Sequence, residues 1–401
     1  MRAWCAKSAR GRRPEERPPA VRKVGRGRSG HPIGEEGRGR IGERGGKGQG
    51  AVLRCGPAAG KVLKKVPVRE STGLVLGHDL TQVVPGVFKG VAFRRGHRIR
   101  PEDLPQLLAM GKEHIYVYVP EPGEVHEDEA AVRLATALAG PGVHWNGPRE
   151  GKVNLVAAGP GLLRVSRVVI DAVNARGDMV VATLHDAQPV AAGQVLAGAR
   201  VIPLVVPEAL VAAVEEFAAA HGPGLEVKPF RPIKAGVIVT GNEVVSGRVR
   251  DGFAPRVEEK LARYGSSIGR VRYLPDGTGG IAAAIHEMAT AGMGMILVCG
   301  GMSVDADDTT PAAIRESGAR VVIYGTPVFP GAMFMLAYLD EVPVLGLPAC
   351  VLHDPATVFD LVLPRLLAGE RITREEIIVR GVGGLCRQCA TCTYPACSFG
   401  K

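Results

Sequence analysis

No apolar run in this 401-residue sequence is long enough to cross a membrane. The longest apolar stretches, such as Ala235–Thr240 and Met295–Cys299, are interrupted by glycine or polar residues well before the roughly 18 residues that a spanning helix needs. The start of the chain also lacks the apolar segment of a secretory signal. We therefore expect a cytoplasmic protein that does not associate with membranes.

Net positive charge is absent from the body of the chain, although the whole sequence carries +10. Residues 1–55 contain 15 Lys and Arg against 5 Asp and Glu, whereas residues 56–401 contain 35 of each class. The basic opening is rich in Gly, Arg and Pro, so it cannot bury enough apolar surface to fold, and we expect residues 1–60 to be a disordered extension. No aromatic residue follows Trp4 within it, which favours an extension without function over an arm that binds phosphate backbones. No specific nucleic acid is expected as a partner.

Half of the eight cysteines fall in one short segment near the end of the chain. The segment reads Cys386-x2-Cys389-x2-Cys392-x4-Cys397, which indicates metal ligation in a reducing compartment rather than a disulfide framework. The consecutive x2 spacings are similar to those that wrap an iron–sulfur cluster, but four thiolates also satisfy a tetrahedral Zn²⁺ ion. The sequence does not decide between an iron–sulfur cluster and Zn²⁺.

Composition and periodicity divide the rest of the chain into four regions. Residues 61–149 contain short β-like runs separated by Gly and Pro, which predict a β-rich N-terminal module. Residues 150–234 form an α+β middle region with a strand expected at Leu162–Val169 and a helix at Pro207–Ala220. Residues 235–370 alternate strands and helices, closing with a helix near Asp354–Leu367, and predict a three-layer α/β domain with a mostly parallel sheet. Residues 371–401 form the tail that carries the cysteines.

Four loops of the α/β domain follow predicted strands, so they meet at the edge where such sheets bind ligands. The residues that these loops offer for binding are Thr240, Gly241, Asn242 and Glu243 in the first, Gly300, Gly301, Ser303, Asp305 and Asp308 in the second, Pro330 and Gly331 in the third, and Pro348 in the fourth.

The second loop has the composition of an anion site beside a cation site. Gly300 and Gly301 expose backbone N–H groups after a buried strand, and a helix expected to begin near Pro311 adds its positive end, which suits a phosphate. The three acids of the segment would hold Mg²⁺, which commonly takes one or two carboxylates together with phosphate oxygens. An alternative for the second loop is that Asp308 or Thr309 only caps the helix, and the first loop alone is equally consistent with a surface turn. The four loops together favour one ligand crevice.

The four loop sequences read TGNE, GGMSVDADD, PVFPGAM and GLPACV in this order. They resemble the molybdopterin-binding domain shared by the molybdopterin molybdenumtransferases and the molybdopterin adenylyltransferases, whose usual patterns are TGDE, GGxSxGxxD, a PGKP-like loop and GLPGNP. The resemblance covers Ala235 to Leu367, and Lys64 to Leu204 is more loosely similar to the N-terminal parts of the transferase branch.

The resemblance implies a molybdenum cofactor biosynthesis protein that binds adenylylated molybdopterin and inserts molybdate with Mg²⁺. It assigns metal and molybdate handling to Asp308 and Glu243 as catalytic residues. It assigns the pterin and its phosphate to the other residues of the four loops. A homo-oligomer is also implied.

Three departures from the family pattern keep alternatives open. Asp305 stands where the family prefers a third Gly, Ala332 replaces the Lys of the PGKP-like loop, and Ala349–Cys350 replaces Gly–Asn. The lost Lys removes a cation that would attract molybdate, which favours pterin binding over metal insertion. One alternative is a non-catalytic carrier or sensor of the finished cofactor, with the cysteine cluster docking it to a client molybdoenzyme or reporting redox state. Another is a nucleotide pyrophosphatase-like hydrolase, because related domains occur in proteins that process nicotinamide nucleotides.

Overall fold

The computed structural model describes residues 63–401, apart from residues 85–86, 119–121 and 150. The extension predicted for residues 1–60 lies outside the described residues. Within the described part of the chain, every helix is too short or too polar to span a bilayer.

The first region is a small β-rich module. Strand β1 (Leu63–Pro67) pairs antiparallel with β4 (His114–Tyr118), and β2 (Leu80–Val84) pairs antiparallel with β3 (Phe88–Phe93). The single-turn helices η1 (Val68–Glu70) and η2 (Pro101–Asp103) and the helix α1 (Leu104–Ala109) connect them. Val68, Leu76 and Leu107 form the centre of its core, with no exposed surface.

The middle region combines two antiparallel sheets with three helices. One sheet has the order β6-β7-β11-β9, with β6 at Val143–Arg149, β7 at Lys152–Ala157, β9 at Met179–Thr183 and β11 at Val195–Val201. The other has the order β10-β8-β13, with β8 at Gly161–Val165, β10 at Gln188–Val190 and β13 at Leu225–Pro229. The helices are α2 (Glu127–Leu138), α3 (Arg167–Asn174) and α4 (Glu208–His221), and a two-stranded ribbon pairs β5 (Glu124–His126) with β12 (Val205–Pro207).

The strand expected at Leu162–Val169 is wrong in its second half. β8 ends at Val165, and α3 begins at Arg167 directly after it. The β-branched residues of this segment favour a strand by local preference alone. Val169, Ile170 and Val173 nevertheless share one buried face at helical spacing, and the core that this face joins decides the conformation.

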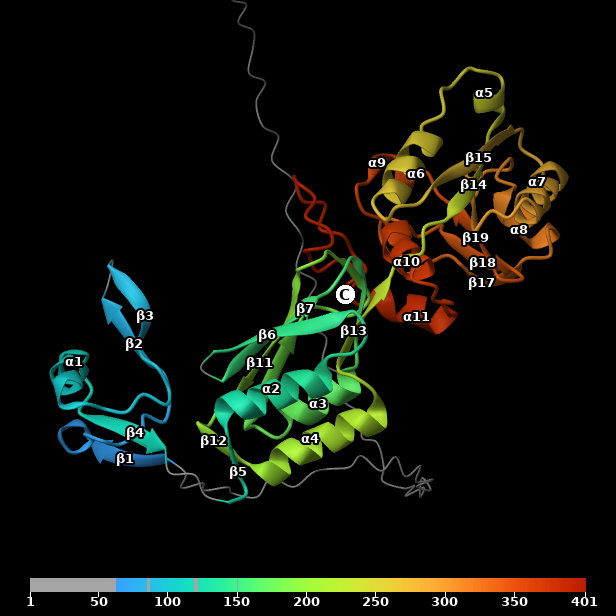
Figure 1. The fold of residues 1–401 in the computed structure, drawn as a ribbon. Coiled ribbons are helices and arrows are strands. Elements are labelled where there is room, and N and C mark those ends of the chain that lie inside the picture. The colour runs from blue at the N-terminus through green and yellow to red at the C-terminus, as the bar shows by residue number, and fades with distance from the viewer. Residues whose placement is uncertain (1–62, 85–86, 119–121, 150) are drawn as a thin grey trace, which may run out of the picture. The chain divides into compact units, whose positions relative to one another are not determined.

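The third region contains a six-stranded sheet in the order β15-β14-β16-β19-β18-β17 (Figure 1). Its strands are β14 (Lys234–Thr240), β15 (Ser267–Leu274), β16 (Met295–Cys299), β17 (Arg320–Tyr324), β18 (Met335–Leu339) and β19 (Val342–Leu347). β18 pairs antiparallel with both of its neighbours, and all other neighbouring strands are parallel.

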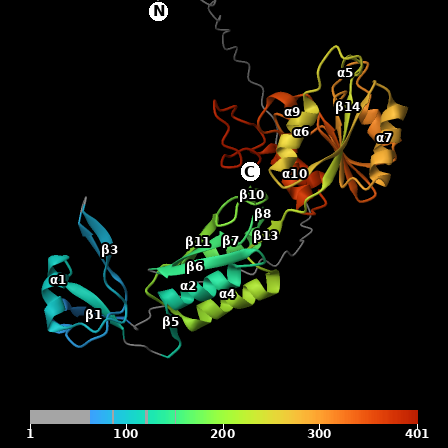
Figure 2. The same cartoon turned by 45° about the horizontal axis from the view of Figure 1, so that its top comes forward.

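Helices cover both faces of this sheet, as Figure 2 shows. α6 (Phe253–Ala262) and α10 (Val358–Leu367) pack on one face with Val237 and Val239, whereas α7 (Thr278–Thr290) and α8 (Thr310–Glu316) pack on the other with Ile238. Successive residues of β14 thus enter different cores, which explains why its sequence is continuously apolar. The prediction of a three-layer α/β domain with a mostly parallel sheet is confirmed.

Two elements of this domain differ from the expectation. No strand was predicted at the position of β18, although β18 is a buried strand between β17 and β19. The closing helix expected near Asp354–Leu367 begins only at Val358, and a separate short helix, α9 (Cys350–His353), ends before Asp354, because Pro355 disfavours helical geometry at the residue before it. α10 then begins at Val358, where the side chains of Thr357 and Asp360 form a capping box.

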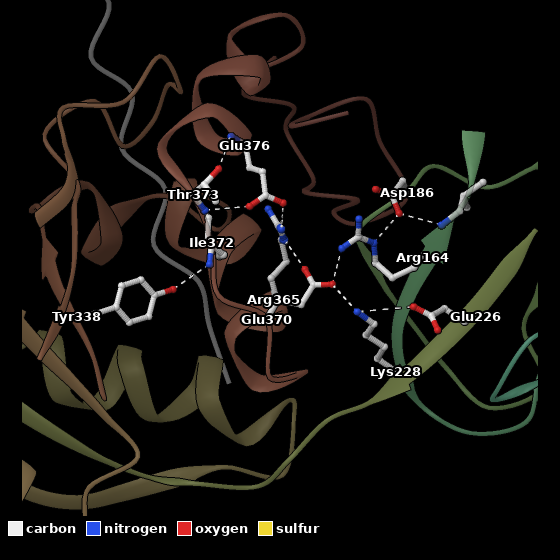
Figure 3. A network of polar contacts seen from close by, with 11 residues as sticks. Arg164, Asp186, Glu226, Lys228, Tyr338, Arg365, Glu370, Ile372, Thr373 and Glu376 are labelled. Atoms are coloured by element: carbon white, nitrogen blue, oxygen red, sulfur yellow. Dashed lines mark hydrogen bonds and ion pairs between the residues drawn. The ribbon is translucent and has the colours of Figure 1, made fainter. Parts of the chain in front are cut away.

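A polar network joins β8 and β13 to the segment after α10 (Figure 3). The buried carboxylate of Glu370 accepts hydrogen bonds from Arg365 Nε at 2.8 Å and from Lys228 Nζ at 3.1 Å, and it also binds Arg164. Burial acts to raise the pKa of Glu370, but Arg365 and Arg164 outweigh it and bring the pKa below its ordinary value. Glu370 therefore remains ionised between the basic groups that surround it.

A second ion pair lies inside the α/β domain. Lys260 of α6 is 1% exposed, and its Nζ donates to Asp360 Oδ1 at 2.7 Å, to Asp360 Oδ2 at 2.8 Å and to the Pro355 carbonyl at 3.0 Å. Burial lowers the pKa of Lys260, and the Asp360 carboxylate opposes that change. The same carboxylate accepts the Thr357 N–H at 2.8 Å, so one group both neutralises Lys260 and caps α10.

Replacement of Lys260 should test how much this pair stabilises the domain. We expect Lys260→Met to lower the free energy of unfolding by ~3–5 kcal/mol, because the Asp360 carboxylate would be left buried without its cation. The matched control is Arg263→Met, whose exposed pair with Glu259 should contribute less than ~1 kcal/mol. Urea unfolding followed by circular dichroism measures both, and equal losses would contradict a special role for Lys260.

Candidate functional site

A cleft of about 630 Å³ lies at the carboxyl ends of β14 and β16. The loops after β14, β15 and β16 line it, together with the start of α9. Among its lining residues are Thr240, Gly241, Asn242, Glu243, Gly300, Gly301, Asp305 and Asp308. The structure therefore brings the first and second predicted loops together.

The remaining predicted residues do not line this cleft. Ser303 and Pro348 belong to loops that reach it through other residues, whereas Pro330 and Gly331 lie in the loop between β17 and β18. β18 and β19 separate β17 from β16, so this third loop follows a strand at the far side of the sheet. The roles assigned to these four residues stay predictions.

The third loop closes on itself and on α10. Thr326 donates its N–H to the Ala332 carbonyl at 2.8 Å and its hydroxyl to the Gly331 carbonyl at 3.0 Å. The Pro330 carbonyl accepts the Val358 N–H at the start of α10 at 3.1 Å. These bonds commit the polar groups of the loop to the structure of the domain.

Two glycines allow β14 and β16 to meet at the floor of the cleft. Gly300 and Gly301 have φ values of +94° and +58°, which only glycine adopts readily. A Cβ atom at Gly300 would lie 2.9 Å from the Thr240 carbonyl oxygen, and one at Gly301 would lie 2.8 Å from Thr310 Oγ1. Side chains at these positions would therefore collide with the end of β14 and the start of α8.

The backbone of this turn leaves one donor available. The carbonyls of Gly300 and Gly301 accept the Thr310 hydroxyl and the Thr310 N–H, at 2.8 Å and 3.2 Å. No acceptor among the described residues takes the N–H of Gly301. The start of α8 offers an anion fewer free N–H groups than expected, because the Thr310 N–H is already bonded and Pro311 has no N–H.

The acids of the second loop are held in a tight turn. Asp308 Oδ2 accepts the Asp305 N–H at 3.0 Å, and the Asp308 N–H donates to the Asp305 carbonyl at 3.0 Å. Thr309, rather than Asp308, occupies the N-cap position of α8. Of the two residues considered as a cap, Thr309 therefore holds the N-cap position, without a side-chain cap hydrogen bond, and the carboxylate of Asp308 lies at the cleft.

The first loop begins with the short helix α5 (Asn242–Val245). The Asn242 N–H donates to Asp276 Oδ2 at 3.1 Å, which ties this loop to the one after β15. The carboxylate of Glu243 lies directly over Gly241, because a Cβ atom built there would be 2.5 Å from Glu243 Oε1. Glu243 thus faces the cleft from the loop that follows β14.

Sequence reasoning missed three polar residues of the cleft. Asp276 follows β15, and Arg248 and Arg250 follow α5. Asp276 carries the same signal as the predicted residues, since it comes two positions after a parallel strand. The two arginines carry no such signal, because they lie in a long loop whose path depends on tertiary contacts.

The cleft is predominantly acidic. Six carboxylates and two guanidinium groups belong to its lining residues. Asp251 caps α6 by accepting the Phe253 N–H at 2.7 Å, but within the described residues no hydrogen bond or ion pair engages the carboxylates of Glu243, Asp305 or Asp307. Within the same residues, no three His, Cys, Asp or Glu side chains form a complete metal site. The donor set fits Mg²⁺, which takes one or two carboxylates and completes its shell with water and phosphate oxygens.

The tail returns to the domain through α11 (Arg374–Ile378) and η3 (Val379–Gly381). The Phe329 N–H donates to the Gly384 carbonyl and the Cys386 N–H donates to the Phe329 carbonyl, both at 2.8 Å. All four predicted metal ligands, Cys386, Cys389, Cys392 and Cys397, line one pocket of about 180 Å³ beside Asp354.

Residues 236–368 match the family model described as a probable molybdopterin binding domain. The resemblance recognised in the loops is thereby confirmed for this molybdopterin-binding-type domain. Residues 65–119 match a second family model, which is described as a domain of unknown function. A search of curated proteins returns no match to the chain.

Several solved structures are similar to parts of the chain. The molybdopterin biosynthesis enzyme MoaB from Thermus thermophilus is 19% identical, over 34% of this chain and 98% of that one, with a TM-score of 0.28. The tungsten cofactor synthesizing protein MoaB from Pyrococcus furiosus is 18% identical, over 30% and 84% respectively, with a TM-score of 0.25. A molybdenum cofactor biosynthesis protein from the same organism is 13% identical, over 77% and 65%, with a TM-score of 0.24. Likenesses of this size carry no conclusion about ligand or activity.

Substitution of Gly300 should test the floor of the cleft in the molybdopterin-binding-type domain. Gly300→Ala and the control Gly318→Ala both place a side chain at positive φ, which costs ~1–2 kcal/mol. Only the Gly300 variant also presses against backbone, because nothing lies within 4 Å of a Cβ at Gly318. We expect Gly300→Ala to lose about 1–3 kcal/mol more in urea unfolding. Equal losses would show that β14 and β16 do not need this close approach.

Proposed function

We propose that this protein takes part in molybdenum cofactor biosynthesis in the cytoplasm, binding adenylylated molybdopterin in the cleft and inserting molybdate with Mg²⁺. The observation that carries the proposal is the meeting of TGNE and GGMSVDADD at one acidic cleft, within the segment that matches the probable molybdopterin binding domain. Parallel α/β sheets bind their ligands at this edge.

The turn after β16 provides the phosphate site in this proposal. The free N–H of Gly301 points to an anion as its partner, and the absence of side chains at Gly300 and Gly301 lets a phosphate approach the backbone. Arg248 and Arg250 supply the positive charge of the cleft.

The acids provide the metal site. Glu243 and Asp308 would hold Mg²⁺ together with phosphate oxygens of the ligand, and the ion would supply Lewis acidity beside the oxyanion. The Asp305 N–H fixes the Asp308 carboxylate by a hydrogen bond at 3.0 Å, while Glu243 lies on the opposite loop. The chain's own contribution is to position these two carboxylates across one cleft.

A non-catalytic carrier of finished cofactor is the second candidate. One observation favours it: the third loop, which has Ala332 in place of the family's lysine, is closed on α10 and the tail and does not line the cleft. Such a carrier would retain the cofactor without transferring molybdate.

Substitutions of Asp308 separate its charge from its place in the turn. Asp308→Asn keeps an oxygen that accepts the Asp305 N–H but removes the charge, whereas Asp308→Ala removes both. We expect both variants to lower molybdate incorporation into adenylylated molybdopterin by roughly 10-fold or more, since even outer-shell changes at metal sites cost about 10–100-fold. The control is Glu341→Gln, whose side chain is 90% exposed and distant from the cleft residues in the fold.

Molybdenum incorporated by purified protein, with and without Mg²⁺, is the measurement. Unchanged incorporation by Asp308→Asn together with a loss in Asp308→Ala would assign Asp308 to the turn alone. A wild-type protein that carries metal-loaded cofactor through purification but transfers no molybdate would support the carrier instead.

A further inference from the structure

The pocket formed by the four tail cysteines is separate from the cleft just described. Its other lining residues include Asp354, Pro355 and Ala356, which connect α9 to α10. Cys386 and Cys397 are half-buried against the core of the α/β domain, whereas Cys389 and Cys392 are exposed. The pocket therefore has one wall made by the domain and one made by the cysteine loop.

The cysteine loop is closed at its base by hydrogen bonds. The Gly400 N–H donates to the Gly383 carbonyl at 2.9 Å, and Arg380 bonds the Gly400 carbonyl at 2.5 Å. The hydroxyl of Tyr394 donates to the Asp360 carbonyl at 2.8 Å, which fastens the middle of the loop to α10. The segment thus forms a loop of defined course that presents four thiols to one space.

Apolar burial does not explain why this loop has a defined course. From residue 382 onward, Phe399 is the one apolar side chain that is fully buried among the described residues. The other side chains that pack against the domain core, Cys386, Tyr394 and Cys397, are only partly buried, so a metal held by the thiols would add a cross-link to this segment. All four cysteines have free thiols, so disulfides do not provide that link.

The spacing of the thiols favours one of the two kinds of metal. Zinc sites with four thiolates usually combine two separated C-x2-C pairs. Here Cys386, Cys389 and Cys392 follow one another at two successive x2 spacings, which is the run that bacterial iron–sulfur clusters use. Cys397 lines the same pocket and supplies the fourth thiol.

We propose that Cys386, Cys389, Cys392 and Cys397 bind a 4Fe–4S cluster that fastens the tail to the α/β domain. A cluster in this pocket would lie against the Asp354–Ala356 connection, and the backbone beside Cys386 pairs with Phe329 of the third loop. Ala349 and Leu352 belong to the start and the body of α9, which leads into this connection, and both line the cleft. Cluster occupancy therefore orders the third loop and the connection that reaches the cleft.

The test uses the full chain purified without oxygen after expression in iron-replete cells. We expect about four iron and four acid-labile sulfide per chain, with a visible absorption band that bleaches on reduction. The variant Cys389→Ser/Cys392→Ser should lose both, and because these two side chains are exposed, the domain itself should remain folded by circular dichroism. Cys350→Ser, which changes a half-buried cysteine outside the tail, should retain the cluster.

Hydrogen exchange reports the fastening of the tail independently of any activity. Loss of the cluster in the double variant should increase exchange at least several-fold in the peptides of residues 326–333 and 381–401, and leave α7 unchanged. Stoichiometric zinc without sulfide, the absence of any bound metal, or a cluster retained by the double variant would overturn the proposal. A cluster whose loss leaves the exchange of both peptides unaltered would overturn its role in fastening the tail.

Discussion

The buried ion pair between Lys260 and Asp360 is the contact on which the other functional parts of the α/β domain depend. Lys260 holds the Pro355 carbonyl and the Asp360 carboxylate, and that carboxylate caps α10. The first residue of α10 then bonds the Pro330 carbonyl of the third loop, and the Asp360 carbonyl accepts the Tyr394 hydroxyl of the tail. α6, which carries Lys260, begins at the wall of the cleft. One buried pair therefore positions the cleft wall, the third loop and the cysteine loop together.

Much of this fold could be predicted from local pattern. β14 and β16 are continuous apolar runs bounded by glycine, which is how a strand buried on both faces must read, and the loops that follow them meet because parallel strands end at one edge. The grouping of Glu243 with Asp308 follows from this geometry, since β14 and β16 are neighbours in the sheet. The order of the strands in the sheet could not be read from the sequence. The two strands followed by the most recognisable loops, β14 and β16, are adjacent in the structure.

The rest depends on contacts between distant residues, for which the local sequence has no signal. The order of the strands is one example, since β18 and β19 lie between β17 and β16 and keep Pro330 and Gly331, in the loop after β17, away from the cleft. Arg248 and Arg250 line the cleft from the loop after α5, and the path of that loop depends on tertiary contacts. The four cysteines were visible as a metal motif, but the pocket they line includes the connection before α10, which only the folded chain brings near.

The acidity of the cleft determines which ligands it can bind, whereas Ala332 lies in the third loop, away from the cleft. A cleft with six carboxylates and two guanidinium groups repels a free phosphate, so an anionic ligand needs a divalent cation to bridge it to these acids. A lysine at position 332 would not have met that need, because the third loop does not line the cleft. This loop instead pairs with the tail through Phe329, next to the first cysteine. The loss of the lysine therefore affects the loop that pairs with the tail. The positive charge near Glu243 and Asp308 comes from Arg248 and Arg250.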